Sequence, residues 1–199
     1  QGGGPVATAL CTLSALGWPT VLFDSQSDDS TGQAILRELG DLRVDSSHIR
    51  IHKGFSSTHA HILVRRHDGA RHIHYLPATC PELMPHDIDT ALFRHAALLH
   101  LNGRHEAVAR EAVKVAKEAG VPISFDGGAG RWRESLRVLV LASSIRILAK
   151  DFALKFAGTE SIEDAAKALR EDHCALLVIT DGVRGSWVWS DDGEHFHQP

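Results

Sequence analysis

The sequence predicts an α/β protein of three layers, in which a parallel sheet lies between helices on both faces. Short continuous apolar runs of strand length recur along the chain, as buried parallel strands require. Segments with apolar residues at helical spacing alternate with them. A chain of 199 residues with 43% hydrophobic content can bury one sizeable core. We therefore expect a single domain over residues 1–199, with a hairpin inserted at residues 57–76.

The expected elements follow in chain order. A helix begins at Pro5, which suits a first helical position, and ends before Gly17, which suits the residue just past a helix. The further helices are expected at residues 32–39, 105–119, 131–139, 151–157 and 161–170. The strands are expected at residues 20–23, 97–101, 121–125, 145–148 and 175–179.

A glycine run, residues 2–4, stands directly before the first helix. Backbone without Cβ atoms at a helix N-terminus can approach a ligand, and the free N–H groups favour polar or anionic oxygens. An ordinary tight loop before a buried helix is the alternative, because residues 6, 9, 10, 13 and 16 form an apolar stripe. The run fits neither the dinucleotide-binding nor the Walker glycine pattern, so neither site is predicted.

One segment, residues 58–75, interrupts the alternation of strands and helices. Asp68 and Gly69 are a strong signal for a two-residue hairpin loop, which would place Arg66 opposite Arg71. One face then carries the apolar side chains of Ala60, Ile62, Val64, Ile73 and Tyr75, and the other carries His59, His61, Leu63, His72 and His74. No carboxylate or cysteine accompanies the histidines at ligand spacing, which favours a solvated polar face over a metal site.

The apolar face of this hairpin needs a cover, because a two-stranded hairpin is marginal alone. It packs either on its own domain or on another chain. We predict a homodimer through the hairpin, since a two-fold contact is the commonest oligomer symmetry.

Polar residues stand at or beyond the ends of several expected strands, where ligands bind in doubly wound sheets. They are Asp24, Asn102, Arg104, Asp126, Thr180 and Asp181. A cap or turn role is the alternative for each of them. The Arg104 guanidinium suits bidentate recognition of phosphate, sulfonate or carboxylate, or else a surface ion pair with Glu106 or Asp126.

Composition argues against several classes of partner. With 21 basic and 25 acidic residues, the chain lacks the basic field that nucleic-acid binding needs. Cys11, Cys80 and Cys174 are widely separated, which predicts neither a disulfide framework nor a zinc site and fits a reducing, cytoplasmic compartment. There is no leader pattern and no apolar run of membrane-spanning length, so we expect no membrane insertion.

Several motifs, in order along the chain, resemble those of the ribokinase-like (PfkB) carbohydrate kinases. Residues 3–9 (GGPVATA) with the closing Leu-Gly at 16–17 resemble the first family signature, although Thr8 stands where many members carry Asn. Residues 28–32 (DDSTG) resemble the acidic turn before the next helix, and residues 44–49 (VDSSHI) the entry to the next strand. Residues 101–105 (LNGRH) are similar to a sugar-contacting stretch of ketohexokinase-like and sulfofructose-kinase-like members, and residues 180–185 (TDGVRG) resemble the nucleotide-side turn.

This resemblance implies a ribokinase-like α/β/α fold with a β lid that closes over the sugar, and an ATP-dependent sugar kinase that uses Mg²⁺. The implied substrate is a monosaccharide or a derivative, such as a ketose or an acidic sugar. The implied substrate-binding residues are Gly3, Gly4, Thr8, Asn102 and Arg104. The implied nucleotide-binding residues are Lys150, Asp151, Thr180, Gly182 and Gly185; the hydroxyl of Thr180 and the flexible backbone after it suit phosphate and ribose, although a plain hairpin turn fits the glycines equally.

Two departures from the family pattern bear on activity. The Asn-x-x-Glu motif should fall near residues 149–152 (AKDF), where Asp151 would substitute in part, or water and phosphate alone would hold Mg²⁺. The signature that carries the catalytic Asp does not occur, so the base is expected beyond Pro199, and the chain looks truncated at both ends relative to the family. The alternatives are a catalytically inactive sugar-binding or regulatory protein and a nucleoside kinase.

Overall fold

The computed structural model describes residues 2–199, and Gln1 lies outside the described residues. The chain divides into two compact units, Gln1–Leu83 and Met84–Pro199, hereafter unit 1 and unit 2. Each unit is described by itself. The sequence analysis expects a single domain over residues 1–199. This division into units does not test that expectation, which remains a prediction.

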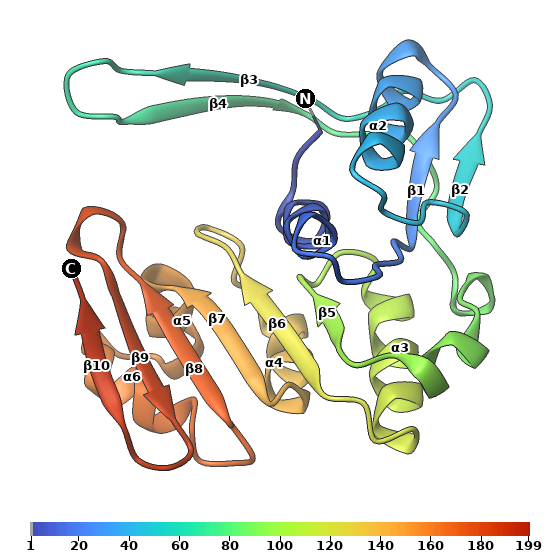
Figure 1. Ribbon diagram of the computed structural model, residues 1–199. Coiled ribbons are helices and arrows are strands. Elements are labelled where there is room, and N and C mark those ends of the chain that lie inside the picture. Colours follow the sequence, from blue (N-terminus) through green and yellow to red (C-terminus); the bar gives the residue numbers. More distant parts are fainter. Residues whose placement is uncertain (1) are drawn as a thin grey trace. The chain divides into compact units, whose positions relative to one another are not determined.

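Unit 1 contains two helices and two strand pairs (Figure 1). Its elements are α1 (Pro5–Ala15), β1 (Asp24–Ser27), α2 (Ser30–Asp41), β2 (Ile49–His52), β3 (His59–Val64) and β4 (Arg71–Leu76). Strands β1 and β2 are parallel, with Asp24 opposite Ile49. A small core of Leu22, Leu39, Val44 and Ile49 lies beneath them, and side chains of α1 and α2 pack against it.

The first strand begins four residues later than the apolar pattern predicts. The segment expected as a strand, residues 20–23, contributes a single bridge between Val21 and Asp45, and Asp24 begins β1 instead of following a strand. Ser25 and Ser27 are buried because their hydroxyls donate to the carbonyls of Pro81 (2.6 Å) and Phe55 (2.5 Å). Hydrogen-bonded serines occupy the core-facing positions, so a search for apolar strands misses β1.

The ends of α1 agree with the sequence prediction. Gly4 is the residue before the helix, Pro5 is its first residue, and Gly17 follows it with φ +92°. The N–H of Gly17 donates to the carbonyl of Ser14, and that of Trp18 to the carbonyl of Leu13. This paired arrangement ends helices where a glycine can adopt positive φ.

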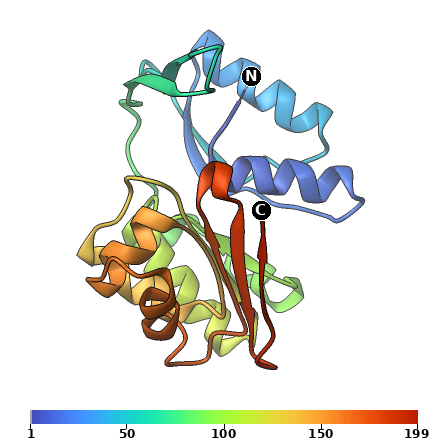
Figure 2. The ribbon, with the colours of Figure 1, turned by 90° about the vertical axis from the view of Figure 1, so that its left-hand side faces the viewer.

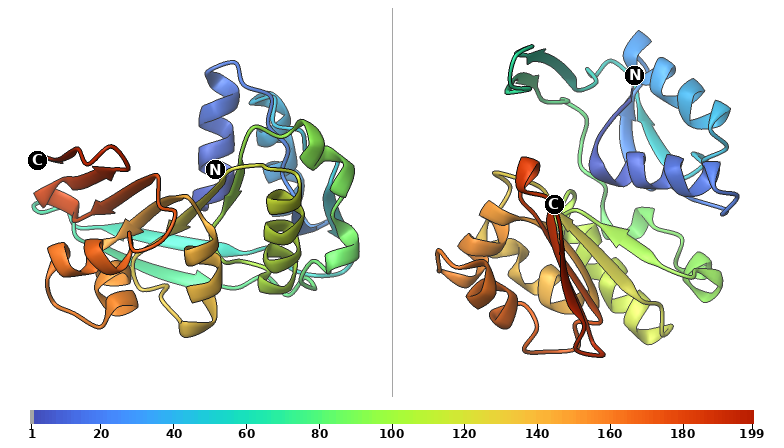
Figure 3. Two further views of the ribbon diagram at one scale, coloured as in Figure 1. Left: turned by 90° about the horizontal axis from the view of Figure 1, so that it is seen from below. Right: turned by 60° about the vertical axis from the view of Figure 1, so that its left-hand side comes forward.

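The hairpin β3–β4 extends from unit 1 as a two-stranded ribbon (Figures 1 and 3). The predicted pairing of Arg66 with Arg71 is wrong: Val64 lies opposite Arg71, and the N–H of Arg65 donates to the carbonyl of Ala70. Asp68 explains the longer loop, because its carboxylate accepts from the Arg65 guanidinium and from the Ala70 N–H. The register moves by two residues, so every side chain keeps its predicted face.

Unit 2 contains a six-stranded mixed sheet in the order β10-β9-β8-β7-β6-β5. Its strands are β5 (Leu99–Leu101), β6 (Ile123–Gly127), β7 (Ile145–Ala149), β8 (Leu176–Thr180), β9 (Ser186–Ser190) and β10 (His195–Gln198). Its helices are η1 (Pro85–Asp87), η2 (Thr90–His95), α3 (Glu106–Glu118), η3 (Glu134–Leu136), α4 (Arg137–Ala142), α5 (Lys150–Ala157), α6 (Ile162–Ala168) and η4 (Gly182–Arg184). Strands β5 to β8 are parallel to one another, whereas β9 pairs antiparallel with β8, and β10 pairs antiparallel with β9.

Helices α3 to α6 lie on one side of this sheet (Figures 1 and 2). The chain adds β5, β6, β7 and β8 in one direction, and right-handed crossovers taken in one direction place their helices on one face. The sequence analysis predicts helices on both faces of the sheet. Within unit 2, the helices α3 to α6 cover only one of the two faces (Figures 1 and 2). Within residues 2–199 we find no helix with the length and apolar character that a bilayer crossing requires.

The core of unit 2 lies between these helices and the sheet. Phe125, Phe152, Leu148, Leu177 and Ile179 have no exposed surface, and the helix predicted at 131–139 is present as η3 followed by α4. Close packing of this core fixes the positions of the carboxyl ends of β5 to β8. It thereby also fixes the polar residues at those strand ends.

Candidate functional site

The carboxyl edge of β5 to β8 gathers most of the predicted site residues of unit 2. Because the four strands are parallel neighbours, their ends meet at one edge of the sheet. Asn102 follows β5 and Lys150 follows β7, whereas Asp126 and Thr180 are residues of β6 and β8 themselves. This edge is where an open α/β sheet offers a ligand site.

An ion-pair cluster stands at the ends of β7 and β8. The ammonium of Lys150 lies 3.0 Å from a carboxylate oxygen of Asp181, and the Nε of Arg184 lies 2.6 Å from the same oxygen. Arg184, and to a smaller degree Lys150, lower the pKa of Asp181 to about 2. Two cationic side chains around one carboxylate give this cluster a net positive formal charge.

Lys150 is the first residue of α5, where a cation is unfavourable for the helix dipole. The pair with Asp181 offsets part of that cost. A lysine at a helix N-terminus strengthens the attraction that the terminus already has for anions. Lys150 at this position therefore favours the binding of a phosphate, although it does not stabilise α5.

Asp151 has a structural task in the adjoining loop. Its carboxylate accepts from the N–H of Gly130 at 2.7 Å and so ties the loop after β6 to the start of α5. Trp132 from the same loop packs edge-on against Phe152 and Phe156. Asp151 is thus a loop-positioning residue, and its predicted role toward the nucleotide stays a prediction.

The turn after β5 is fixed by its own contacts. The side-chain oxygen of Asn102 accepts from the N–H of Arg104 at 3.1 Å, and Gly103 has φ +76°. A Cβ at Gly103 would stand 2.5 Å from a methyl of Leu136, so this glycine is required by packing. Arg104 itself is exposed. Of the two partners predicted for it as an alternative, Glu106 and Asp126, Glu106 also pairs with Arg133 at 2.8 Å.

The turn after β8 is a hairpin that contains η4. Thr180 and Gly182 are exposed, and Gly182 has φ +56° with open space around it. Gly185 differs, because a Cβ there would stand 1.9 Å from the carbonyl oxygen of Gln198 in β10. Packing of β10 explains Gly185, while Thr180 and Gly182 remain available to a ligand.

The predicted sugar-binding residues of unit 1 lie at the beginning of α1. Gly3, Gly4 and Thr8 are exposed, and nothing lies within 4 Å of a Cβ built on Gly3 or Gly4. Gly4 has φ +101°, a conformation that side chains disfavour. The N–H groups of the first helical turn are open to a ligand here, because no side chain caps this helix.

The acidic turn at residues 28–32 has a clear role in folding. The Asp29 carboxylate accepts from the N–H groups of Gly32 and Ser57 (both 2.8 Å) and from the Ser57 hydroxyl (2.7 Å). These hydrogen bonds lower the pKa of Asp29 to about 2. A Cβ at Gly32 would stand 2.0 Å from the carbonyl oxygen of Ser27, so the motif encodes a tight strand-to-helix turn.

Three polar side chains lie on one face of β5 and β6: His100, Ser124 and Asp126. The sequence analysis names only Asp126 among them. His100 lies opposite Ser124, and its Nδ1 is 3.0 Å from the Ser124 hydroxyl. Its buried Nε2 has no hydrogen-bond partner among residues 2–199. Burial lowers the pKa of His100 and raises that of Asp126, which lies two residues after Ser124 in β6 and therefore on the same face. The available signal was a polar residue at alternate positions of two otherwise apolar strands.

The described part of the chain, residues 2–199, contains no group of three His, Cys, Asp or Glu side chains placed to hold a metal ion. Any divalent cation here needs ligands from water or from a bound phosphate.

Comparison with known proteins identifies the family. The pfkB family of carbohydrate kinases matches residues 1–199, and the chain belongs to this family. The α/β fold predicted from the sequence is confirmed as ribokinase-like.

Several individual relatives and solved structures are similar to the chain. The ATP-dependent ribose-1-phosphate kinase of Halopiger xanaduensis is 30% identical over 198 residues, which are 99% of this chain and 65% of the relative. An E. coli structure in complex with ATP and Mg²⁺ superposes with TM-score 0.85 at 19% identity, covering 98% of this chain and 67% of the other. Ribokinase of Arabidopsis thaliana, solved with ribose and ATP, gives TM-score 0.78 at 23% identity, covering 98% and 66%. The chain spans less than two thirds of the length of the curated relatives that it matches.

Proposed function

We propose that the full-length protein is an ATP-dependent sugar kinase that transfers the γ-phosphate to a hydroxyl of a monosaccharide or sugar derivative. The observation that carries the proposal is the Lys150, Asp181 and Arg184 cluster at the first residue of α5, in a member of the pfkB family. Phosphoryl transfer needs alignment and charge stabilisation more than covalent chemistry from the protein.

The nucleotide phosphates would lie against this cluster. Lys150 and Arg184 supply positive charge, and Asp181 holds both side chains in place. The exposed hydroxyl of Thr180 and the open backbone at Gly182 offer further contacts to phosphate or ribose. The residues present therefore fit the anionic part of ATP.

Mg²⁺ would arrive with ATP in this proposal, coordinated by phosphate oxygens and water. This fits the residues, because the Asn and Glu of the usual motif are absent and Asp151 is engaged by Gly130. Mg²⁺ commonly keeps several waters and takes one or two carboxylates besides phosphates. The ion would neutralise charge on the transferred group.

The sugar hydroxyls would bind the open N–H groups at Gly3 and Gly4 and the hydroxyl of Thr8. For unit 2, the family resemblance implies Asn102 and Arg104 as sugar-binding residues, and the Arg104 guanidinium suits an acidic substituent. The proposal places the catalytic base beyond Pro199, because the signature that carries it is not in these 199 residues.

A thermal-shift panel with the full-length protein tests the proposal. Specific ligands raise the midpoint of unfolding by mass action. We expect a shift with ATP and Mg²⁺, a further shift with one or a few sugars, and loss of the ATP shift in Lys150→Met. Sugar binding without ATP binding would favour an inactive sugar-binding protein, and preference for nucleosides over sugars would favour a nucleoside kinase.

We also propose a homodimer through the apolar face of the hairpin. Ile62, Val64, Ile73 and Tyr75 are each at least half exposed within this chain, an unusual clustering for a surface ribbon. Packing two such faces together would bury them in a closed two-fold contact.

Two neighbouring substitutions on β3 test the dimer by sedimentation velocity. Ile62→Asp puts a carboxylate on the apolar face and should yield monomers, because an unpaired buried charge is costly. Leu63→Asp makes the same change on the opposite face and should leave the dimer intact. A monomeric wild type, or equal behaviour of the two variants, would contradict the proposal.

A further inference from the structure

The turn after β5, residues 102–105, has a backbone conformation that its own sequence does not favour throughout. Gly103 has φ +76°, which glycine adopts freely, but His105 has φ +51° and carries a Cβ. His105 is also buried, and its side chain does not cap α3. Besides the hydrogen bond to the Asn102 side chain, the turn therefore depends on contacts from elsewhere in the fold.

Arg133 supplies such contacts from the loop after β6. Its Nη2 donates to the carbonyl of Gly103 at 2.8 Å, and its Nε donates to the carboxylate of Glu106 at 2.8 Å. The hydroxyl of Ser135 donates to the same carboxylate oxygen at 3.0 Å. One planar guanidinium thus holds the turn at its middle and at Glu106, the first residue of α3.

The loop that carries Arg133 is itself fixed on the side of α5. The ring of Trp132 packs edge-on against Phe152 and Phe156, with ring centroids 5.1 and 5.3 Å apart. The guanidinium of Arg137 lies 5.3 Å from the centroid of the Trp132 ring. Phe152 has no exposed surface, so the loop rests on the core of unit 2. Arg133 therefore reaches the turn from a fixed position.

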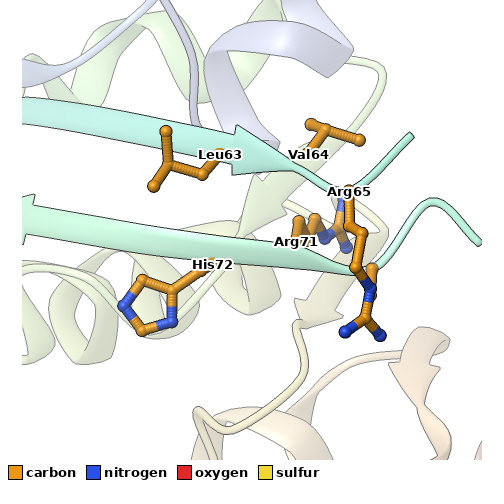
Figure 4. A pocket seen from close by; sticks show the side chains of 6 residues that line it. Leu63, Val64, Arg65, Arg71 and His72 are labelled. Carbon is orange, nitrogen blue, oxygen red and sulfur yellow. The ribbon is translucent and has the colours of Figure 1, made fainter. Parts of the chain in front are cut away.

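The basic side chains at the hairpin tip lack comparable contacts. Figure 4 shows an open pocket there, of about 370 Å³, with Arg71 and His72 in its lining. These two are consecutive residues of β4, so their side chains point to opposite faces of an exposed ribbon. They do not converge on one ligand, whereas Asn102 and Arg104 belong to one turn that the fold holds in place.

We propose that Arg133 is a positioning residue for the acceptor sugar, because it holds the turn that presents Asn102 and Arg104. This inference rests on the proposed function, in which that turn contacts the sugar. A side chain binds its ligand more tightly when its backbone is ordered before the ligand arrives. Without Arg133 the Gly103 carbonyl loses its donor, so part of the binding free energy of the sugar goes into ordering the turn.

Kinetics and calorimetry of the full-length protein, with ribose, fructose and ribose 1-phosphate as acceptor probes, test the inference. Arg133→Gln should raise the KM and the Kd for the acceptor at least tenfold. The KM for ATP should stay within twofold and kcat within threefold, because the turn holds the acceptor equally in the ground state and the transition state. The midpoint of thermal unfolding should stay nearly unchanged, since the Arg133 side chain is 54% exposed.

Arg110→Gln is the matched control. Arg110 lies 3.9 Å from the carboxylate of Glu106 and donates to the carbonyl of Ser135 at 2.7 Å, and among the described residues it makes no hydrogen bond to the turn. It should change the acceptor affinity less than twofold. Amide hydrogen exchange gives a readout without any ligand: residues 102–105 should exchange faster in Arg133→Gln than in Arg110→Gln.

The outcomes separate this inference from the kinase proposal. Equal losses of acceptor affinity in the two variants would show a general effect of charge and overturn the positioning role, as would a loss of ATP affinity as large as that of acceptor affinity. Sugar-dependent ADP release that Arg133→Gln leaves unchanged would overturn the inference and leave the kinase proposal intact. Arg133-dependent sugar binding without any ADP release by the wild type would support the inference and overturn the kinase proposal.

Discussion

Replacement of Arg146 should cost unit 2 a large part of its stability. Arg146 lies on β7 with no exposed surface. Its guanidinium donates to the carbonyls of Ser143 (2.9 Å), Leu141 (3.1 Å) and Leu169, and to the Asp172 carboxylate (2.9 Å). The carbonyls stand at the ends of α4 and α6, where the helices leave such groups unpaired.

The magnitude follows from these contacts. In Arg146→Met the buried methylene positions stay filled, but three carbonyls lose their donor, and each unsatisfied buried group costs about 1–3 kcal/mol. We expect a loss of about 3–9 kcal/mol, against a total stability of about 5–15 kcal/mol for a typical domain. Because Lys150 directly follows β7, a loosened β7 should also weaken ATP binding.

Urea unfolding followed by tryptophan fluorescence measures the effect, with Asp172→Asn as the control. The Asp172 side chain is 43% exposed, and the side-chain oxygen of an asparagine can still accept from the Arg146 guanidinium, so Asp172→Asn should cost less than Arg146→Met. A loss below about 1 kcal/mol in Arg146→Met, or an equal loss in Asp172→Asn, would refute the reasoning that the carbonyl contacts dominate.

Three more outcomes are expected. Gly3→Val should abolish most of the sugar affinity measured by titration, because the added side chain would occupy ligand space. The melting temperature should not change, since a Cβ at Gly3 has open space and its backbone is not at positive φ. Normal sugar affinity in this variant would mean that the loop only leads into α1 and does not bind the sugar. The pKa of Asp29 is about 2, below its ordinary 3.8, so its contribution to stability is present above about pH 4 and is lost as the pH falls toward 2. In Asp29→Asn, the free energy of unfolding should therefore depend less on pH over this range. An unchanged dependence on acid pH would contradict this role of Asp29. Gly185→Ala should lower the melting temperature by several degrees because its Cβ would meet the Gln198 carbonyl, whereas Gly182→Ala, with open space, should cost less; equal shifts would contradict the role of β10.

The parts of the fold that the sequence predicts well are those with strong periodicity or special backbone chemistry. The helices α1, α3, α5 and α6 and the strands β5 to β8 lie within a few residues of the predicted bounds. Gly17 marks the end of α1 because positive φ is needed there. Continuous apolar runs predict buried parallel strands since both of their faces pack.

The misses have a common physical origin in tertiary hydrogen bonds. Strand β1 is buried through serine hydroxyls that reach carbonyls distant in sequence, which no local pattern records. The hairpin loop is set by the Arg65 to Asp68 pair instead of the Asp-Gly dipeptide alone. At the candidate site, the sequence indicates Lys150 and the turn after β8, but their joining through Asp181 depends on neighbouring strand ends.

Sugar-dependent release of ADP by the full-length protein tests the central claim most directly. A coupled assay over ribose, fructose, ribose 1-phosphate and adenosine, with ATP and Mg²⁺, should show turnover with a sugar or sugar phosphate, and Lys150→Met should reduce that turnover at least tenfold. Absence of sugar-dependent ADP from a full-length protein that contains an intact catalytic Asp would contradict the account.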